Sequence, residues 1–249
     1  MSCSQPEGRS EIIGTGTFPT THWSVVISAG QNTSPQVTEA LEVLCRTYWY
    51  PLYVHVRRRG YDAQEAQDLT QEFFLRLLTN DHLSHADRSR GRFRSYLLVA
   101  LNHFLTDDWR RGQAAKRGGG QMLISLDADT AEARYALEPS SDLTPEKVYE
   151  RCWALTLLDQ SMTKLKEECL AAGKDHQFEQ LESYLTNEAT QSDCAAVGVK
   201  LGMTPGAVSV AIHRLRHRYR ELVREAVTHV VASPAEVEDE IRWLFAAAA

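Results

Sequence analysis

The sequence predicts an all-α protein with two small helical domains. Apolar residues recur at helical spacing through most of the chain, and no stretch has a strand pattern of any weight. The triplet Gly118-Gly119-Gly120 interrupts this pattern near the middle, and 249 residues suit one large or two small domains. The expected layout is a disordered arm over 1–19, a helical domain over 20–117, a linker over 118–144, a second helical domain over 145–230 and a helical tail over 231–249.

The first domain is predicted to be a bundle of three helices preceded by a short apolar helix that starts near Thr20–Trp23. The first long helix covers about 35–59, where Pro51 is expected to kink or split it. Asp62 is expected to cap the second, and the third covers about 92–114. The buried stripe of the second helix is predicted to comprise Ala66, Leu69, Phe73, Phe74, Leu77 and Leu78.

The region 118–144 mixes acids with small residues and has no stable period, which predicts a flexible acidic linker. Thr144-Pro145-Glu146 then provides an N-cap, a proline at the first helical position and an acid near the positive helix end. Helices are expected over about 145–172, 175–186, 191–200 and 204–229, followed by a short amphipathic helix over 234–245.

Charge is unevenly distributed in this acidic chain, whose formal net charge is −6. Residues 88–117 contain eight Arg and Lys against two Asp, and residues 205–224 contain five Arg against one Glu. Residues 125–170 contain ten acids against five bases. A protein of this kind is expected to reach nucleic acid through its two local basic patches, with the help of a partner.

The first basic patch places cations at both ends of the third predicted helix, interleaved with Phe93, Tyr96, Phe104 and Trp109. Cations follow phosphates and aromatic rings stack on bases, so this combination suits single-stranded or melting DNA. The alternative is a solvated basic helix whose aromatic residues are core. Helical spacing favours the core for Phe93, Tyr96 and Phe104, whereas Trp109 fits either interpretation.

Residues 193–224 are typical of a helix-turn-helix, with Gly202 at the turn and Thr204 as the cap of the second helix. Antiparallel helix pairs that bind no DNA are common. The five arginines of the second helix favour DNA, because a packing helix does not need them. The residues expected off its apolar stripe are Ser209, His213, Arg214, Arg216 and Arg220.

No catalytic site, cofactor or metal site is predicted, so the chain is not expected to be an enzyme. The five cysteines are scattered, and the nine histidines have no metal-ligand spacing. Walker, GxSxG and dinucleotide-binding motifs are absent from the sequence. No run approaches the roughly 18 apolar residues of a membrane span, and the first 16 residues contain no apolar signal core, so a cytoplasmic location is expected.

Asp68, Gln71 and Glu72 share one helical face, which on its own is more typical of a solvated surface than of a site. The wider arrangement nevertheless resembles the extracytoplasmic-function (ECF) sigma factors of bacterial RNA polymerase over about residues 36–225. Region two is similar in Tyr50–Tyr53, Asp68–Phe74, Phe93–Leu97, Asn102 and Asp108–Arg111. Region four is similar in Leu201–Val208 and His213–Arg216.

This resemblance implies an initiation factor that binds core RNA polymerase and promoter DNA. It implies that Asp68, Gln71, Glu72 and Phe73 dock on the clamp helices of the polymerase. Melting and recognition of the minus-ten element are assigned to the loop 82–91 and to Arg90, Arg92, Arg94, Tyr96, Asn102, Trp109, Arg110, Arg111 and Lys116. Recognition of the minus-thirty-five element is assigned to Thr204, Pro205, Gly206, Ser209, His213, Arg214, Arg216 and Arg220, while the other side of this unit meets the polymerase flap.

The chain departs from the family at two places. Ser209, Val210 and Ala211 stand where basic or polar side chains are common, so DNA recognition is expected to depend more on His213, Arg214, Arg216 and DNA shape. The tail helix over 234–245 lies beyond the two-domain layout. It either packs on region four or restrains the protein by covering the basic helix with its acids, Glu236, Glu238, Asp239 and Glu240.

Control by an anti-sigma partner is compatible with the sequence. A helix-turn-helix regulator that acts without polymerase is the main rival function, and an enzyme is a distant third.

Overall fold

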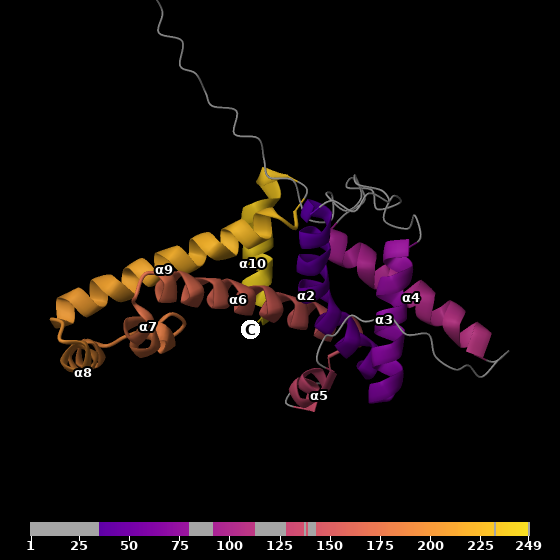
Figure 1. Ribbon diagram of the computed structural model, residues 1–249, viewed down its shortest axis with the longest axis horizontal. Helices are drawn as coiled ribbons and strands as arrows, with labels where there is room; N and C mark the ends of the chain where they lie inside the picture. Colours follow the sequence, from indigo (N-terminus) through magenta and orange to yellow (C-terminus); the bar gives the residue numbers. More distant parts are fainter. Residues whose placement is uncertain are drawn as a thin grey trace, which may run out of the picture.

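The computed structural model describes residues 35–79, 92–112, 128–136, 138, 143–231 and 233–248 (Figure 1). Within these ranges every regular element is a helix, which confirms the all-α prediction. The predicted arm, the short helix after Thr20, the loop 82–91 and the glycine triplet lie outside the described residues. The elements are α2 (Pro35–Arg58), α3 (Ala63–Thr79), α4 (Phe93–Gly112), α5 (Ala128–Ala136), α6 (Pro145–Ala171), α7 (Asp175–Leu181), η3 (Glu182–Tyr184), α8 (Gln191–Leu201), α9 (Pro205–Thr228), η4 (Pro234–Glu236) and α10 (Val237–Ala248).

The sequence predicts a kink or a split at Pro51; helix α2 continues through Pro51, so the split is wrong, and the kink stays a prediction. Proline removes one backbone hydrogen bond from the helix interior, which normally costs about 3 kcal/mol. Here the whole segment Thr47–Val56 is buried, because α6, α3 and α4 all pack against α2. Burial on all sides keeps the segment helical despite the lost bond.

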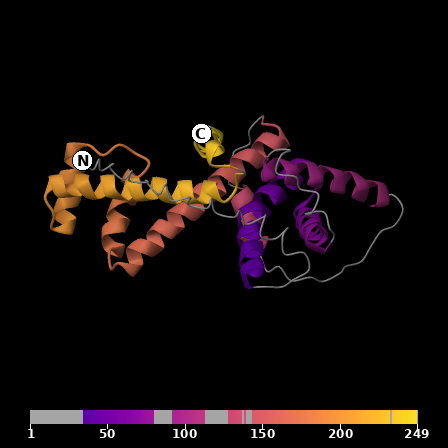
Figure 2. The same cartoon turned by 90° about the horizontal axis from the view of Figure 1, so that it is seen from above.

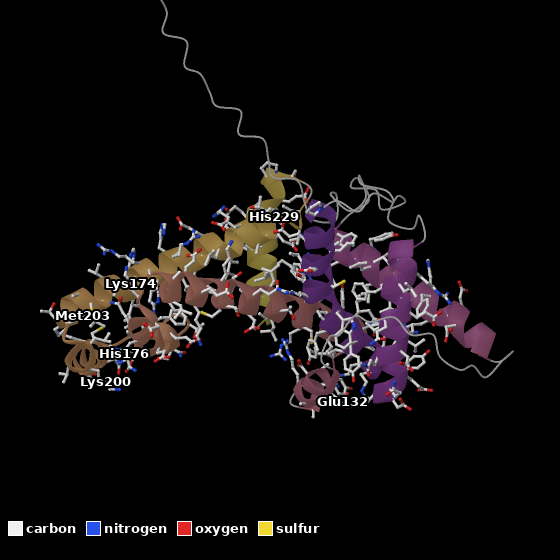
Figure 3. All side chains as sticks on the ribbon, viewed as in Figure 1. Glu132, Lys174, His176, Lys200, Met203 and His229 are labelled. Atoms are coloured by element: carbon white, nitrogen blue, oxygen red, sulfur yellow. The ribbon has the colours of Figure 1, made fainter. Side chains whose placement is uncertain are left out.

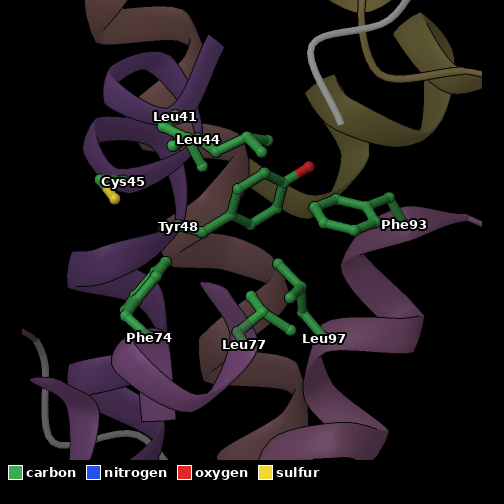
Figure 4. Close-up of a pocket in the computed structure, with 8 residues that line it drawn as sticks. All are labelled: Leu41, Leu44, Cys45, Tyr48, Phe74, Leu77, Phe93 and Leu97. Carbon is green, nitrogen blue, oxygen red and sulfur yellow. The ribbon is translucent and has the colours of Figure 1, made fainter. Parts of the chain in front are cut away.

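Helices α3 and α4 complete the bundle around α2. Asp62 caps α3 as predicted: its side chain accepts a hydrogen bond from Glu65 N at 2.8 Å, and the Glu65 carboxylate accepts one from Asp62 N at 3.3 Å. The bundle core leaves a cavity of only about 10 Å³, far below the volume of a ligand site. Figure 4 shows its lining by Leu41, Leu44, Cys45, Tyr48, Phe74, Leu77, Phe93 and Leu97.

Helix α5 lies inside the stretch where no stable helix was predicted. Its Glu132 accepts two hydrogen bonds from the Arg57 guanidinium of α2, at 2.8 and 3.1 Å, and one from the Tyr53 hydroxyl. The Arg57 pairing lowers the pKa of Glu132. A helix of nine residues is rarely stable alone in water, so these long-range contacts with α2 explain why α5 is helical.

Helix α6 connects the two ends of the molecule. Figure 2 shows α3 and α4 at one end, α7 and α8 at the other, and α6 running between them. The first half of α6 packs along α2 and contributes Tyr149 and Trp153 to the core of the bundle. Its second half contributes Leu165 and Cys169 to a smaller core under α7 and α9. The predicted domain boundaries stay a prediction.

Candidate functional site

The pair α8 and α9 has helix-turn-helix geometry. The two helices are bent by 98° at their connection, within the usual range for this motif. Gly202 ends α8 with φ +65°, the left-handed conformation that its position in the turn was predicted to need. Thr204 caps α9 by accepting a hydrogen bond from Ala207 N at 3.3 Å, also as predicted. Figure 3 shows Met203 at this corner, near Lys200 of α8.

The close packing of α8 on α9 depends on a second glycine. A Cβ atom at Gly198 would lie 2.6 Å from the carbonyl oxygen of Met203, which is backbone and cannot turn away. Val208 and Ile212 of α9 and Val197 of α8 form the buried core beneath this contact. The turn signal in the sequence predicts the role of Gly202 but not that of Gly198.

The outer side of α9 holds most of the residues predicted to contact the upstream DNA element. The exposed ones are Thr204, Pro205, Gly206, Ser209, His213, Arg214 and Arg220. Arg214 and Arg220 form no ion pair or hydrogen bond with any described residue. Their guanidinium groups are therefore open to an external anion.

The other three arginines of α9 have partners inside the protein. Arg216, predicted to contact DNA, donates hydrogen bonds from Nε to Tyr184 O at 2.9 Å and from Nη2 to Asn187 O at 2.6 Å. Arg218 makes a two-point contact with Glu168 of α6, at 2.7 and 2.8 Å, which lowers the pKa of Glu168. Arg224 pairs with Glu238 of α10. Of the five arginines of α9, only Arg214 and Arg220 are therefore free of a partner among the described residues.

The predicted downstream site on α4 is arranged differently. Arg94 is buried, and its guanidinium pairs with the Glu240 carboxylate of α10. Its Cζ atom lies 3.7 Å from the ring centroid of Trp243 and 4.8 Å from that of Trp153. Burial lowers the pKa of Arg94 to about 10, so it stays charged at neutral pH. In this structure Arg94 faces the protein interior instead of an external strand.

Arg92 lies next to this cluster but is partly exposed. Its Nε is 2.9 Å from the second carboxylate oxygen of Glu240, and its Cζ is 5.8 Å from the Trp243 ring centroid. One carboxylate thus pairs with both arginines at the start of α4. The sequence predicts either that the acids of the tail cover the basic helix or that the tail packs on region four. Helix α10 does pack on α9, where Glu238 pairs with Arg224, while Glu240 covers the other basic patch.

Tyr96 and Asn102, the next predicted contacts on α4, are half-buried. Tyr96 stacks on Phe93, with ring centroids 6.1 Å apart. Asn102 Oδ1 accepts a hydrogen bond from Arg59 at 2.7 Å and lies 3.0 Å from Nε2 of the buried His55, so it joins α4 to α2. The remaining predicted residues have side chains outside the described part of the structure: Arg90, Trp109, Arg110, Arg111 and Lys116.

The predicted polymerase-binding face lies on the outer side of α3. Asp68 is exposed and accepts a hydrogen bond from Gln64 at 3.0 Å. Gln71 and Glu72 are half-exposed, and Glu72 forms an ion pair with Arg76, which lies one helical turn later in α3. Phe73 is buried against Phe74 and Phe104, so it supports this face from beneath.

A signal for the Glu240 cluster was present in the sequence. Val237, Glu240 and Leu244 fall on one face of α10, and all three are buried. An acid in an apolar stripe predicts a buried cation as its partner, because an unpaired buried charge is very costly. The sequence could not identify that cation, because Arg94 lies 146 positions away.

Among the described residues, no group of three or more His, Cys, Asp and Glu could hold a metal ion. No single helix in the described ranges is long and apolar enough to cross a membrane. Only α8 and α9 taken together, across their 98° bend, reach such a length and composition.

The right-angled pair α8–α9, with its exposed basic side, defines the molecule as a helix-turn-helix protein of the DNA-binding class. The chain belongs to the ECF sigma factor family, whose family model matches residues 39–204. The matched segment covers α3, α4, α6 and α8 and ends at the cap of α9. The searches of curated proteins and of solved structures gave no match. As a member of this family the protein is a sigma factor that acts in transcription initiation.

Proposed function

We propose that this protein binds core RNA polymerase through the outer side of α3 and directs it to promoters through two DNA-binding helices, α4 downstream and α9 upstream. The observation that supports this best is that α4 contacts the first half of α6, whereas the N-terminal part of α9 lies beyond the other end of α6 (Figure 1). A helix of 27 residues spans about 40 Å, a little more than one turn of duplex DNA. One protein can thus contact two separate promoter elements.

In this proposal the N-terminal half of α9 enters the major groove of the minus-thirty-five element. Ser209, Val210 and Ala211 offer few hydrogen-bond donors to base edges. Arg214, Arg220 and His213 supply contacts to phosphates or bases, and DNA shape supplies the remaining discrimination. Arg216 supports this surface by holding the carbonyl groups before α8.

DNA opening at the minus-ten element is a binding effect in this proposal. The pairing energy lost on melting is offset when an unpaired base stacks on an aromatic side chain and phosphates contact arginines. Tyr96 of α4 and Arg92, the residue before α4, are half-exposed and suit these two tasks. The proposed roles of Trp109, Arg110 and Arg111 rest on the sequence resemblance.

Retention by immobilised core RNA polymerase tests the docking surface. The double variant Asp68→Arg, Glu72→Arg reverses charge on the α3 face and is expected to lower retention at least tenfold. The matched control is Glu39→Arg, Glu42→Arg, which makes the same charge change on exposed positions of α2. Equal retention of wild type and both variants would contradict docking through α3.

A helix-turn-helix regulator that acts without polymerase is the second candidate. The observation in its favour is that α9, with its two unpaired arginines, begins where the family match ends. Such a regulator would bind an upstream duplex equally well with and without core enzyme. The proposed sigma factor is expected to bind that duplex specifically only in the presence of core.

A further inference from the structure

We propose that α10 is a displaceable cap that keeps Arg92 and Arg94 away from promoter DNA until the protein is assembled with polymerase on its target. This inference rests on the proposed function, because it concerns the same downstream DNA surface. The occupant of that surface in the free protein is a segment of the chain itself, with Glu240 in the place of a nucleic-acid phosphate.

The geometry of the carboxylate is that of an anion held by two arginines. One oxygen of Glu240 pairs with Arg94 and the other lies 2.9 Å from Arg92 Nε. The side chains of Glu240 and Arg94 are 1% and 5% exposed, so an external strand has no access to this pair in the closed state. A phosphate group offers the same two-oxygen contact to arginine.

Trp243 completes the cap. Its ring lies over the Arg94 guanidinium and is 5.8 Å from the ring of Trp153 on α6, measured between centroids. Trp243 and Glu240 both belong to α10, so freeing Arg94 requires movement of this helix and cannot be achieved by one side-chain rotation. DNA that binds Arg94 must therefore displace α10.

The cap is held in a way that allows release. A buried ion pair adds little net stability, because removing both charges from water offsets most of their attraction. Arg94 Nε and Glu240 Oε2 are buried without a hydrogen-bond partner among the described residues, and Oε2 has only its ion pair with Arg92, which weakens the closed state further. The exposed pair Arg224–Glu238 contributes about 0–1 kcal/mol. Val237 and Leu244, buried against the main core, are the apolar anchors of α10.

The position of α10 also links the two DNA-binding helices. It follows α9 after a short connection and packs on both α9 and α6, while its side chains reach α4 (Figures 1 and 2). The closed state thereby ties the upstream helix to the downstream arginines. Release of α10 would free both helices to adjust to the spacing of a promoter.

Hydrogen exchange of the α10 amides in the full-length protein tests the cap. We expect slow exchange of residues 237–248 in the free wild type. Exchange of the same amides should be at least tenfold faster when wild type is bound to core polymerase and to a forked DNA with a single-stranded minus-ten segment. This comparison needs no variant. If α10 stays fully protected from exchange in wild type bound to core polymerase and forked DNA, the cap is overturned. The proposed function is left intact by that result.

The variant Glu240→Gln removes the charge that pairs with both arginines and keeps the size of the side chain. Asp239→Asn is its matched control: it makes the same change on an exposed residue of α10 whose partner, Arg242, lies on the same helix. Glu240→Gln is expected to speed α10 exchange in the free protein and to raise affinity for the forked DNA in the presence of core by about fivefold or more. Asp239→Asn should change neither.

A Glu240→Gln variant with faster α10 exchange but unchanged DNA affinity would overturn the proposal, because the helix would then be a packing element only. Failure of wild type to bind core polymerase at all would instead overturn the proposed function. The two failures are therefore distinguishable in one set of samples.

Discussion

The two basic helices of this protein look alike in sequence and differ in the folded molecule. At the start of α4, Arg92 and Arg94 pair with a carboxylate from the C-terminal helix, and Arg94 is buried between aromatic side chains. On α9, Arg214 and Arg220 are exposed and have no partner among the described residues. The structure therefore leaves the proposed upstream DNA surface open and covers part of the proposed downstream one.

This difference teaches that a count of cations does not measure a nucleic-acid surface. Each patch has a clear excess of positive charge in sequence. What decides whether an arginine can bind phosphate is the location of the nearest acid in the fold, and both Glu168 and Glu240 lie far from their partners along the chain. An excess of arginine can serve tertiary structure as readily as DNA.

The largest expected effect is a difference in protein stability between variants of the two basic patches. Arg94→Ala leaves Glu240 buried without its partner, which should lower the free energy of unfolding by about 3–5 kcal/mol. Arg214→Ala should change it by no more than about 0.5 kcal/mol. Urea unfolding followed by circular dichroism measures both values. Similar small losses for the two variants would show that Arg94 is not buried as the structure has it.

A companion variant sharpens that result. Replacing both charges, as Arg94→Met with Glu240→Leu, removes the pair without leaving either charge alone. This double variant is expected to recover most of the stability lost in Arg94→Ala. A double variant as unstable as Arg94→Ala would mean that the loss comes from packing around Trp153 and Trp243 instead of from charge.

The next effect concerns the exposed arginines of α9, Arg214 and Arg220, and the turn between α8 and α9 that positions them. Gly198→Ala places a methyl group against the Met203 carbonyl and should cost about 1–3 kcal/mol of stability, with weaker binding of upstream duplex. Gly206→Ala is the stability control, because nothing lies within 4 Å of the added carbon. Thermal unfolding of both variants distinguishes them; equal midpoints would exclude the close approach of α8 to α9.

DNA recognition by α9 provides the third comparison. Arg214→Ala is expected to weaken binding of the upstream element by about 1–3 kcal/mol if that side chain contacts a base. Arg218→Ala is the control, since Arg218 already pairs with Glu168 of α6. Fluorescence anisotropy with a labelled promoter and core polymerase, at one fixed salt concentration, gives both affinities. An unchanged sequence preference in Arg214→Ala would remove this residue from the recognition surface.

The smallest expected effect is a pH dependence at the contact between α6 and α9. Arg218 lowers the pKa of Glu168, so this pair stabilises the fold above the unfolded pKa of Glu, about 4.3, and the contribution disappears as pH falls through the folded pKa. Because both side chains are more than one third exposed, the contribution is at most about 1 kcal/mol. Glu168→Gln should lower stability at pH 7, and this loss should shrink as pH falls below about 4.3. An equal loss at neutral and at acidic pH would assign the effect to packing.

Most of the helices could be predicted from the sequence, because their signals are local. The caps at Asp62, Thr144 and Thr204, and the glycine at 202, act through neighbours within a few residues and were predicted correctly. The sequence leaves open whether α2 continues through Pro51, and it does not predict α5, because both features depend on contacts with distant helices. Periodicity alone carries no information on such contacts.

The candidate site shows the same division between local and distant information. Exposure of Ser209, His213 and Arg214 follows from the apolar stripe of α9. The partners of Arg94 and Arg216 do not follow from any local pattern, because one is a carboxylate in the tail and the other is a pair of backbone carbonyl groups before α8. Interior partners of charged residues require the folded structure.

The most direct test of the central claim is run-off transcription with purified core RNA polymerase on a library of genomic promoters. The protein is expected to direct initiation from a small set of promoters that share two elements, and the Asp68→Arg, Glu72→Arg variant is expected to abolish this activity. RNA products identical in pattern and amount to those of core enzyme alone would contradict the account.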